Sequence, residues 1–237
     1  MKARTYFIAG TDTDVGKTYI TALLTQALRQ QGVNAIAYKP VACGSTEDAQ
    51  QLFAAYTQNP IEGVAMLDLE IADICPVYFQ LPASPYTAMK VSGHEEQAPK
   101  LVQEMNDSLA YLQENFDVVL VEGVGGWEVP LKADMSMADW VFELSQRCTH
   151  PLEILLVADN KLGMLNHTKL TTMAIRARGL VCKYLILNYT KEEWSSVCIS
   201  NRAEIGAWAG VELLTEVIHG QDYLELPELF LQQVAQV

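Results

Sequence analysis

Five short runs of continuously apolar residues constrain the fold of this chain more than any other feature of its sequence. The runs are TYFIAG (5–10), NAIAYKP (34–40), DVVLVEG (117–123), EILLVAD (153–159) and KYLILN (183–188). A strand with one solvent-exposed face alternates apolar and polar residues, whereas a strand covered on both faces is apolar throughout. The runs are therefore predicted to be strands buried on both faces of a sheet.

Amphipathic stretches separate these runs and are predicted to be helices, the clearest being Lys17–Gln31 and Glu95–Asn115. Alternating strands and helices favour an α/β fold, in which a mostly parallel β-sheet carries helices on both faces. Residues 59–94 fit no element clearly, whereas the chain from Gly210 onward predicts a last strand and a closing helix. Because no repeat, low-complexity stretch or linker interrupts the chain, residues 1–237 are expected to form a single domain.

Residues suited to phosphate and metal chemistry follow three of the predicted strands directly. Gly10–Thr18 follows the first run, Lys39 lies at the end of the second, and Glu122 lies at the end of the third. In open parallel sheets, ligands bind beyond the carboxyl ends of the strands. The topology is therefore expected to bring these segments together at one rim of the sheet.

The segment GTDTDVGKT (10–18) resembles a phosphate-binding loop, except that five residues, not four, separate Gly10 from Gly16. Unpaired backbone N–H groups at the start of the following helix favour a bound phosphate. Lys17 can reach the outer phosphates, and the hydroxyl of Thr18 can ligate Mg²⁺. The segment is therefore predicted to bind a nucleotide.

The extra residue in this loop indicates that it does more than wrap phosphate. Thr13 and Asp14 are candidates to face a second substrate. The alternative interpretation is a plain strand–turn–helix junction, in which Thr11, Asp12 or Thr13 caps the helix. Placement after a strand and before a helix favours the nucleotide site.

Magnesium requires further oxygen ligands, usually carboxylates and phosphates. Glu122 ends an apolar strand and precedes GVGG (123–126), whose glycines allow the backbone to approach a ligand closely. Asp48 is a second candidate, although Glu47 beside it could serve equally and both could simply open a helix. Lys39, in YKPVACGS (38–45), would join Lys17 in neutralising charge on a transferring phosphoryl group.

Taken together, these pieces resemble the dethiobiotin synthetase family. The resemblance rests on GTDTDVGKT (10–18), YKPVACGS (38–45), VLVEGVGGWEVPL (119–131), ADW (138–140) and NKLGMLNHTKLT (160–171). It covers most of the chain as far as Asn188. The first block with its five-residue spacing, joined to YKPV and EGVGGW, is highly specific.

The resemblance implies a P-loop NTPase-like three-layer architecture and a homodimer whose substrate site lies near the subunit interface. It also implies an ATP- and Mg²⁺-dependent ligase that closes the ureido ring of dethiobiotin in biotin synthesis. The substrates would be 7,8-diaminononanoate and CO₂. One amine captures CO₂ as a carbamate, ATP phosphorylates the carbamate, and the other amine attacks to close the ring, releasing ADP and phosphate.

The resemblance also implies roles for individual residues. Catalytic roles fall to Lys39, Lys17 and Thr13, and metal ligation to Thr18, Asp48 and Glu122. The residues expected to bind the nucleotide are Asp14, Val15, Gly16, Lys17, Thr18, Glu122, Gly125 and Asn188. The residues expected to bind the diamine are Thr13, Lys39, Cys43, Gly163, Met164, Leu165 and Asn166, the last four reaching the substrate of the partner subunit.

Simpler interpretations exist for two of these segments. Asn166 could cap a helix with His167 in its first turn, and His167 as a general base is a minor alternative. Asn188, which matches the adenine-recognising asparagine of the family by position, could be an ordinary turn residue at a strand end.

Three positions depart from the family pattern. Cys43 stands where serine is common, and a thiol is the poorer hydrogen-bond donor. Tyr189 replaces a small polar or acidic residue, and LLTEVIHG (213–220) lacks the GEIP-like sequence near the adenine. The last two leave base selectivity open.

Composition narrows the class of protein. A formal charge of −13, from 29 acidic and 16 basic residues, argues against general nucleic-acid binding. Five scattered cysteines without a C-x-x-C pair indicate reduced thiols rather than a disulfide framework or zinc site. With no leader-like N-terminus and no membrane-length apolar run, the chain is expected to be cytoplasmic and to have no membrane partner.

Three rival functions also involve a nucleotide-binding loop of this kind. Corrinoid-type amide synthetases usually carry a fused glutaminase domain, for which 237 residues leave no room. Partitioning or maturation ATPases generally place an additional lysine early in the loop, and residues 11–15 contain none. The third is a P-loop ATPase paralogue that has lost diamine binding. Cys43, in place of the common serine, is consistent with this alternative.

Overall fold

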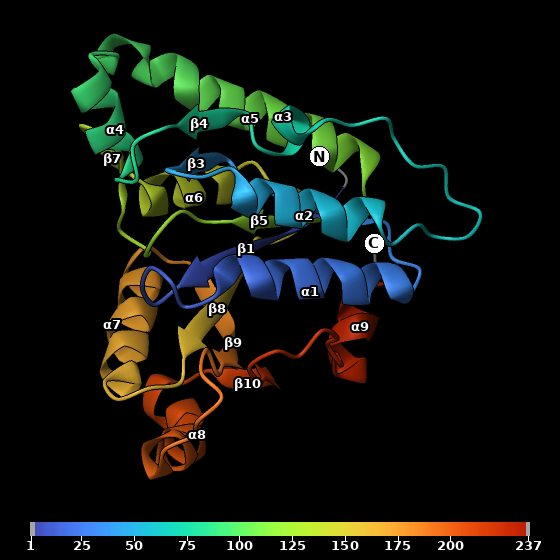
Figure 1. Ribbon diagram of the computed structural model, residues 1–237, viewed down its shortest axis with the longest axis vertical. Coiled ribbons are helices and arrows are strands. Elements are labelled where there is room, and N and C mark those ends of the chain that lie inside the picture. Colours follow the sequence, from blue (N-terminus) through green and yellow to red (C-terminus); the bar gives the residue numbers. More distant parts are fainter. Residues whose placement is uncertain (1–2, 236–237) are drawn as a thin grey trace.

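A six-stranded sheet forms the centre of the computed structural model, which describes residues 3–235 (Figure 1). Its strands are β1 (Arg4–Gly10), β2 (Ala35–Tyr38), β5 (Val118–Glu122), β8 (Glu153–Asp159), β9 (Val181–Asn188) and β10 (Glu212–Val217). They lie in the order β10–β9–β8–β1–β5–β2, and every neighbouring pair is parallel. All five apolar runs are strands of this sheet, so the predicted α/β fold is confirmed.

Both faces of the sheet are buried, as the unbroken apolar runs predicted. Tyr6 and Ile8 of β1 belong to a core shared with α1 (Lys17–Gln30) and α9 (Glu228–Val234). Phe7 and Ala9, which alternate with them, belong to a core on the opposite face. The helices packed into this second core include α5 (Ala98–Asn115), α6 (Met137–Ser145), α7 (Met164–Ala177) and α8 (Ser196–Ala209). Because alternate strand residues point to opposite faces, each strand contributes to both cores.

Residues 59–94, which the sequence left unassigned, form short elements. They are α3 (Ile71–Ile74), β4 (Val77–Phe79) and α4 (Pro85–Ser92). β4 pairs in parallel with β3 (Val41–Cys43), which precedes α2 (Glu47–Thr57). A second small pair, β6 (Pro130–Lys132) and β7 (Met135–Ser136), is antiparallel. Elements this short carry too few residues to show a period, which is why the pattern gave no assignment.

The structure confirms most of one predicted helix and excludes two alternative capping interpretations. The predicted helix Glu95–Asn115 is a 3₁₀ turn (Glu95–Gln97) followed by α5. No side chain caps α1, whose N-cap is Gly16, so capping by Thr11, Asp12 or Thr13 does not occur. The N-cap of α7 is Gly163, which places Asn166 inside the first turn rather than at the cap.

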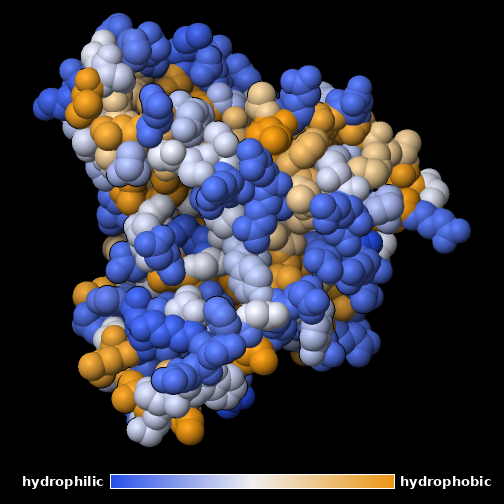
Figure 2. All heavy atoms as spheres, viewed as in Figure 1, coloured by the Kyte–Doolittle hydropathy of each residue, from blue (hydrophilic) through white to orange (hydrophobic). Residues whose placement is uncertain are grey.

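The carboxyl ends of the central strands lie on one side of the molecule. In Figure 1 the arrowheads of β1 and β8 point toward the side on which α4 and α7 lie. Figure 2 shows this side indented between the two halves of the molecule. Within residues 3–235, every helix is too short or too polar to cross a bilayer.

Candidate active site

The loop between β1 and α1 has a backbone that only particular residues allow. Gly16 adopts a φ of 89°, and Asp14 adopts a φ of 57°, a left-handed conformation that is uncommon for residues other than glycine. A Cβ at Gly16 would lie 2.1 Å from Nδ2 of Asn188. This same Nδ2 donates a 2.9 Å hydrogen bond to the carbonyl oxygen of Val15. Asn188, at the end of β9, therefore supports the backbone of this loop through its hydrogen bond to Val15.

The start of α1 is open to an anion. Gly16 provides no side-chain cap, and the first turn contains no acidic residue. The backbone N–H groups of a first helical turn have no partner within the helix, and the helix dipole adds partial positive charge there. An anion such as a phosphate is therefore stabilised at this end of α1.

The side chain of Lys17 folds back over the loop. Its Nζ donates a 3.2 Å hydrogen bond to the carbonyl oxygen of Asp12, and its Cδ and Nζ lie 3.0 Å from the position of a Cβ on Gly10. Burial lowers the pKa of Lys17, and the positive charge of Lys39 adds to this effect, whereas Glu122 opposes it. The negative charge of a bound polyphosphate would stabilise the protonated form of Lys17 and offset the cost of its burial.

Lys39, at the end of β2, lies between two carboxylates that come from different elements. Its Nζ is 2.5 Å from Oδ2 of Asp48 on α2 and 2.6 Å from Oε1 of Glu122 on β5. Burial disfavours the charged form of Lys39, but Glu122 and Asp48 outweigh it, so the pKa of Lys39 is raised. Lys39 is therefore protonated at neutral pH and occupies the place of a cation between the two carboxylates.

The surroundings of Glu122 fit a magnesium ion. Oε1 of Glu122 also accepts a 2.7 Å hydrogen bond from the hydroxyl of Thr18. Its Oε2 is buried and has no hydrogen-bond partner among residues 3–235, which is costly for a carboxylate unless a ligand completes the site. Thr18, Asp48 and Glu122 thus provide hydroxyl and carboxylate oxygens, the donors that Mg²⁺ prefers. Glu47, the alternative to Asp48, is exposed and does not line the cavity described next.

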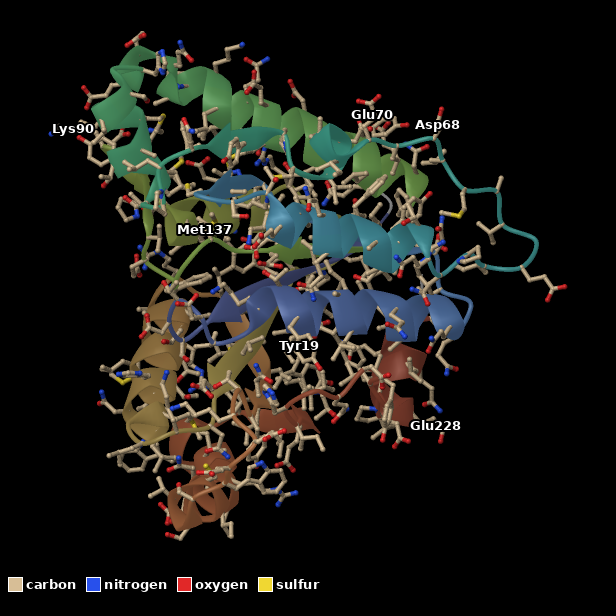
Figure 3. The ribbon with its side chains drawn as sticks, viewed as in Figure 1. Tyr19, Asp68, Glu70, Lys90, Met137 and Glu228 are labelled. Carbon is tan, nitrogen blue, oxygen red and sulfur yellow. The ribbon has the colours of Figure 1, made fainter. Side chains whose placement is uncertain are left out.

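Most of the predicted site residues line one cavity of about 460 Å³. The predicted residues among its lining are Thr13, Asp14, Gly16, Lys17, Thr18, Lys39, Cys43, Asp48, Glu122 and Gly125. Tyr19, Gln51 and Val124 also line it and were not predicted. Tyr19, labelled in Figure 3, donates its hydroxyl proton to the carbonyl of Gln221 in the loop after β10. The G-K-T-Y order could have indicated Tyr19, because it is the residue next to Thr18.

A second cavity, of about 430 Å³, shares a wall with the first. The residues common to both are Thr13, Asp14, Cys43, Val124 and Gly125. The remainder of its lining is Pro82, Ala83, Ser84 and Val129. Sequence reasoning missed Pro82–Ser84 because they precede α4 in the unassigned region, although their proline- and serine-rich turn was a usable signal.

Cys43, the departure from the family pattern, lies where the two cavities meet. Its side chain is half-buried, and burial raises the pKa of the thiol to about 11. The thiol is therefore neutral at pH 7 and available only as a weak hydrogen-bond donor or acceptor.

Tyr189, the second departure, packs against Trp194 and Glu216. Its ring stacks on Trp194 at a centroid distance of 4.6 Å, and its hydroxyl donates a 2.8 Å hydrogen bond to Glu216. Asn188, one residue earlier, faces the loop instead. A role for Asn188 in adenine recognition stays a prediction, because its Nδ2 supports Val15 in this structure.

The four residues expected to reach a partner's substrate do not line either cavity of their own chain. Gly163 and Asn166 are exposed, Leu165 is half-buried, and Met164 is buried in the core. His167, the minor candidate for a general base, is exposed and also lies outside both cavities. The roles of these residues stay predictions.

Known proteins resemble this chain in sequence and in fold. A family model described as an AAA domain matches residues 4–222. The ATP-dependent dethiobiotin synthetase BioD of Akkermansia muciniphila is 37% identical over 226 residues, which cover 95% of this chain and 97% of that protein. The protein of the same name from Vibrio campbellii is 41% identical over 175 residues, covering 74% of this chain and 72% of its own.

A solved structure confirms the fold class. The septum site-determining protein MinD from Pyrococcus horikoshii, complexed with Mg-ADP, superposes with a TM-score of 0.52 and 19% sequence identity. The superposition covers 91% of this chain and 81% of that chain. At this identity the likeness shows a common fold and no more.

Proposed function

The chain belongs to the family of ATP-dependent dethiobiotin synthetases, and from this premise we propose how its two cavities carry out the reaction. The enzyme joins 7,8-diaminononanoate and CO₂ at the expense of ATP, forming dethiobiotin, ADP and phosphate in biotin synthesis. One amine takes up CO₂ as a carbamate, and a carbamate oxygen attacks the γ-phosphorus as ADP leaves. The second amine then attacks the carbamate carbon, losing its proton as phosphate departs.

The observation that carries this proposal is the common wall of the two cavities. The loop that opens α1 contributes Thr13 and Asp14 to both, so one loop contacts both reactants. A carbamate oxygen is a weak nucleophile, and holding it in line with the γ-phosphorus supplies much of the catalysis. The additional residue between Gly10 and Gly16 provides the length for this double contact.

We assign ATP to the larger cavity. The open first turn of α1 would hold phosphate oxygens, and Lys17 would turn from Asp12 toward them. Thr18, Asp48 and Glu122 would hold Mg²⁺, which neutralises phosphate charge when bound. Lys39 would shift from the two carboxylates toward the carbamate and the transferring phosphoryl group, where its positive charge offsets the charge that develops.

The smaller cavity is assigned to the diamine. The aliphatic chain of the substrate would contact the apolar residues of its lining, Pro82, Ala83, Val124 and Val129. Cys43, at the junction with the larger cavity, would lie beside the carbamate. Its neutral thiol would give the carbamate a weaker hydrogen bond than a serine hydroxyl.

A homodimer completes the proposal. Leu162, Leu170 and Met173, which lie just before and along α7, expose between 55% and 83% of their surface. Figure 2 shows hydrophobic side chains in this region, at the lower left of the face in view. Pairing this surface with a second copy would cover it and would bring residues 163–166 to the partner's substrate. Residues 1–237 would act as one ligase domain in the cytoplasm, with no nucleic-acid or membrane partner.

One assay tests the function. The protein is incubated with diaminononanoate, bicarbonate, Mg²⁺ and ATP, and dethiobiotin is measured by mass spectrometry. Dethiobiotin formed in proportion to ADP is the expected result. ATP hydrolysis that proceeds at the same rate with and without the diamine would instead favour the alternative, a P-loop ATPase paralogue with another substrate or partner.

A further inference from the structure

Arg178, immediately after α7, joins three parts of the chain at the edge of the proposed substrate site. Its guanidinium donates to both carboxylate oxygens of Glu128, with a distance of 2.9 Å between Nη2 and Oε2. The same Nη2 lies 3.2 Å from Oδ1 of Asp139 on α6. A two-pronged arginine–carboxylate pair of this kind fixes both distance and orientation.

The Asp139 end of this bridge is held firmly. Oδ2 of Asp139 accepts hydrogen bonds from the backbone N–H and the hydroxyl of Ser136, at 2.8 and 2.7 Å. In return, the backbone N–H of Asp139 donates to the Ser136 hydroxyl, which forms a capping box at the start of α6. Arg178 therefore ties Glu128 to a helix terminus whose geometry is already fixed.

The Glu128 end lies in the loop that lines both cavities. Glu128 directly precedes Val129, which lines the smaller cavity, and follows Trp127, which is buried against Phe7 with a ring centroid distance of 5.9 Å. The earlier part of the loop contains Gly123, Gly125 and Gly126, which have no side chains to anchor it. Backbone hydrogen bonds hold the two ends of the loop, from Gly123 to Ile8 at 3.1 Å and from Met137 to Val129 at 2.8 Å, and the pair with Arg178 adds a charged contact between them.

We propose that Arg178 is a positioning residue that sets the geometry of loop 123–129 at the diamine cavity. Glu128 and Asp139 both face its guanidinium, so removing this charge would leave two carboxylates facing each other across the bridge. Their repulsion would move Val129, which lines the smaller cavity but not the larger one. The nucleotide loop is held separately, by Asn188, and would keep its position.

The proposal rests on the assignment of the diamine to the smaller cavity, and steady-state kinetics test it. In Arg178→Gln, the KM for the diamine should rise about five- to tenfold while the KM for ATP changes less than about twofold. The neutral pair Glu128→Gln with Arg178→Gln removes the repulsion and should return the diamine KM to within about twofold of the wild-type value. Arg147→Gln, which removes an arginine bonded to Asn106 outside the site, is the matched control and should change neither constant.

Hydrogen exchange provides a readout that does not depend on the reaction. Peptides covering residues 123–129 should exchange faster in Arg178→Gln and return to the wild-type rate in the neutral pair. Unaltered exchange, equal increases in both KM values, or a neutral pair no better than Arg178→Gln alone would overturn the proposal. If the wild-type protein makes no dethiobiotin, the proposed function fails, while the exchange result still decides the role of Arg178.

Discussion

At the scale of single residues, Lys39 shows how a side chain can take the place of a ligand. It is buried, it pairs with Asp48 and Glu122, and these two carboxylates are also the predicted metal ligands. Two neighbouring carboxylates can bind one cation tightly. A second cation binds more weakly, because the two positive charges repel each other. Lys39 and a metal ion should therefore compete for the pair.

Replacing Lys39 by methionine tests this competition. In the absence of nucleotide, Lys39→Met should bind Mn²⁺ at least about tenfold more tightly than the wild-type protein, because the competing positive charge is gone. Free Mn²⁺ is measured by electron paramagnetic resonance. Lys161→Met, which removes a lysine paired with Asp159 outside the larger cavity, is the control. Equal or weaker Mn²⁺ binding by Lys39→Met would show that Lys39 does not block the metal ligands.

Cys43 allows a prediction about pH. Burial raises the pKa of its thiol to about 11, so the neutral form is favoured in the folded protein and the reactive thiolate appears only as pH approaches that value. At pH 8, alkylation of Cys43 by iodoacetamide should be about 100-fold slower in the folded than in the urea-unfolded protein. Peptide mass spectrometry measures the rate at this position. Comparable rates in the two states would contradict a buried, neutral thiol.

At the scale of elements, the loop before α1 depends on support from β9. Gly16 and Gly32 both have positive φ angles, of 89° and 80°, but only Gly16 has a neighbour in the way of a Cβ. Adding a Cβ at Gly32 would therefore cost only backbone strain, whereas adding one at Gly16 would also displace Asn188.

Alanine substitutions at these two glycines provide a matched pair. Gly32→Ala should lower the free energy of unfolding by about 1 kcal/mol and leave ATP binding unchanged, because the cost is local backbone strain. Gly16→Ala should lower it further and reduce ATP affinity at least about tenfold, because the new Cβ displaces Asn188 and the loop. Urea unfolding and calorimetric titration with Mg-ATP measure the two effects. Equal effects of the two substitutions would remove Asn188 as a support of the loop.

At the scale of the whole molecule, the proposed dimer makes activity depend on association. Leu170 lies on α7 within the surface proposed to pair, whereas Leu229 is equally apolar and 79% exposed on α9. A buried, unpaired charge is costly in an interface, and a charge at an exposed position costs little.

Glutamate substitutions at the two leucines distinguish these surfaces. Leu170→Glu should sediment as a monomer and lose at least about tenfold in kcat/KM, because residues 163–166 no longer reach a partner's substrate. Leu229→Glu should keep both the dimer and the activity. A fully active monomer, in sedimentation velocity at assay concentration, would exclude a pocket shared between subunits.

The sequence determined the strands and the chemistry of their ends. Continuous apolar runs can be satisfied only by burial on both faces, and the residues that follow such strands in a parallel sheet must meet at one rim. For this reason the sequence alone predicts that Thr18, Lys39 and Glu122 lie close together. The same apolar runs predicted the fold class, whereas the family followed from the resemblance of the motif blocks.

Features that depend on packing between distant segments became visible in the folded protein alone. The tertiary structure distinguished Asp48 from Glu47, directed Tyr189 toward Trp194, and brought the turn before α4 to the second cavity. It also joined Arg178 to Glu128, 50 residues away. The hydrophobic period and the composition depend on residues that are close along the chain. These contacts form between elements far apart in the sequence, so no local pattern predicts them.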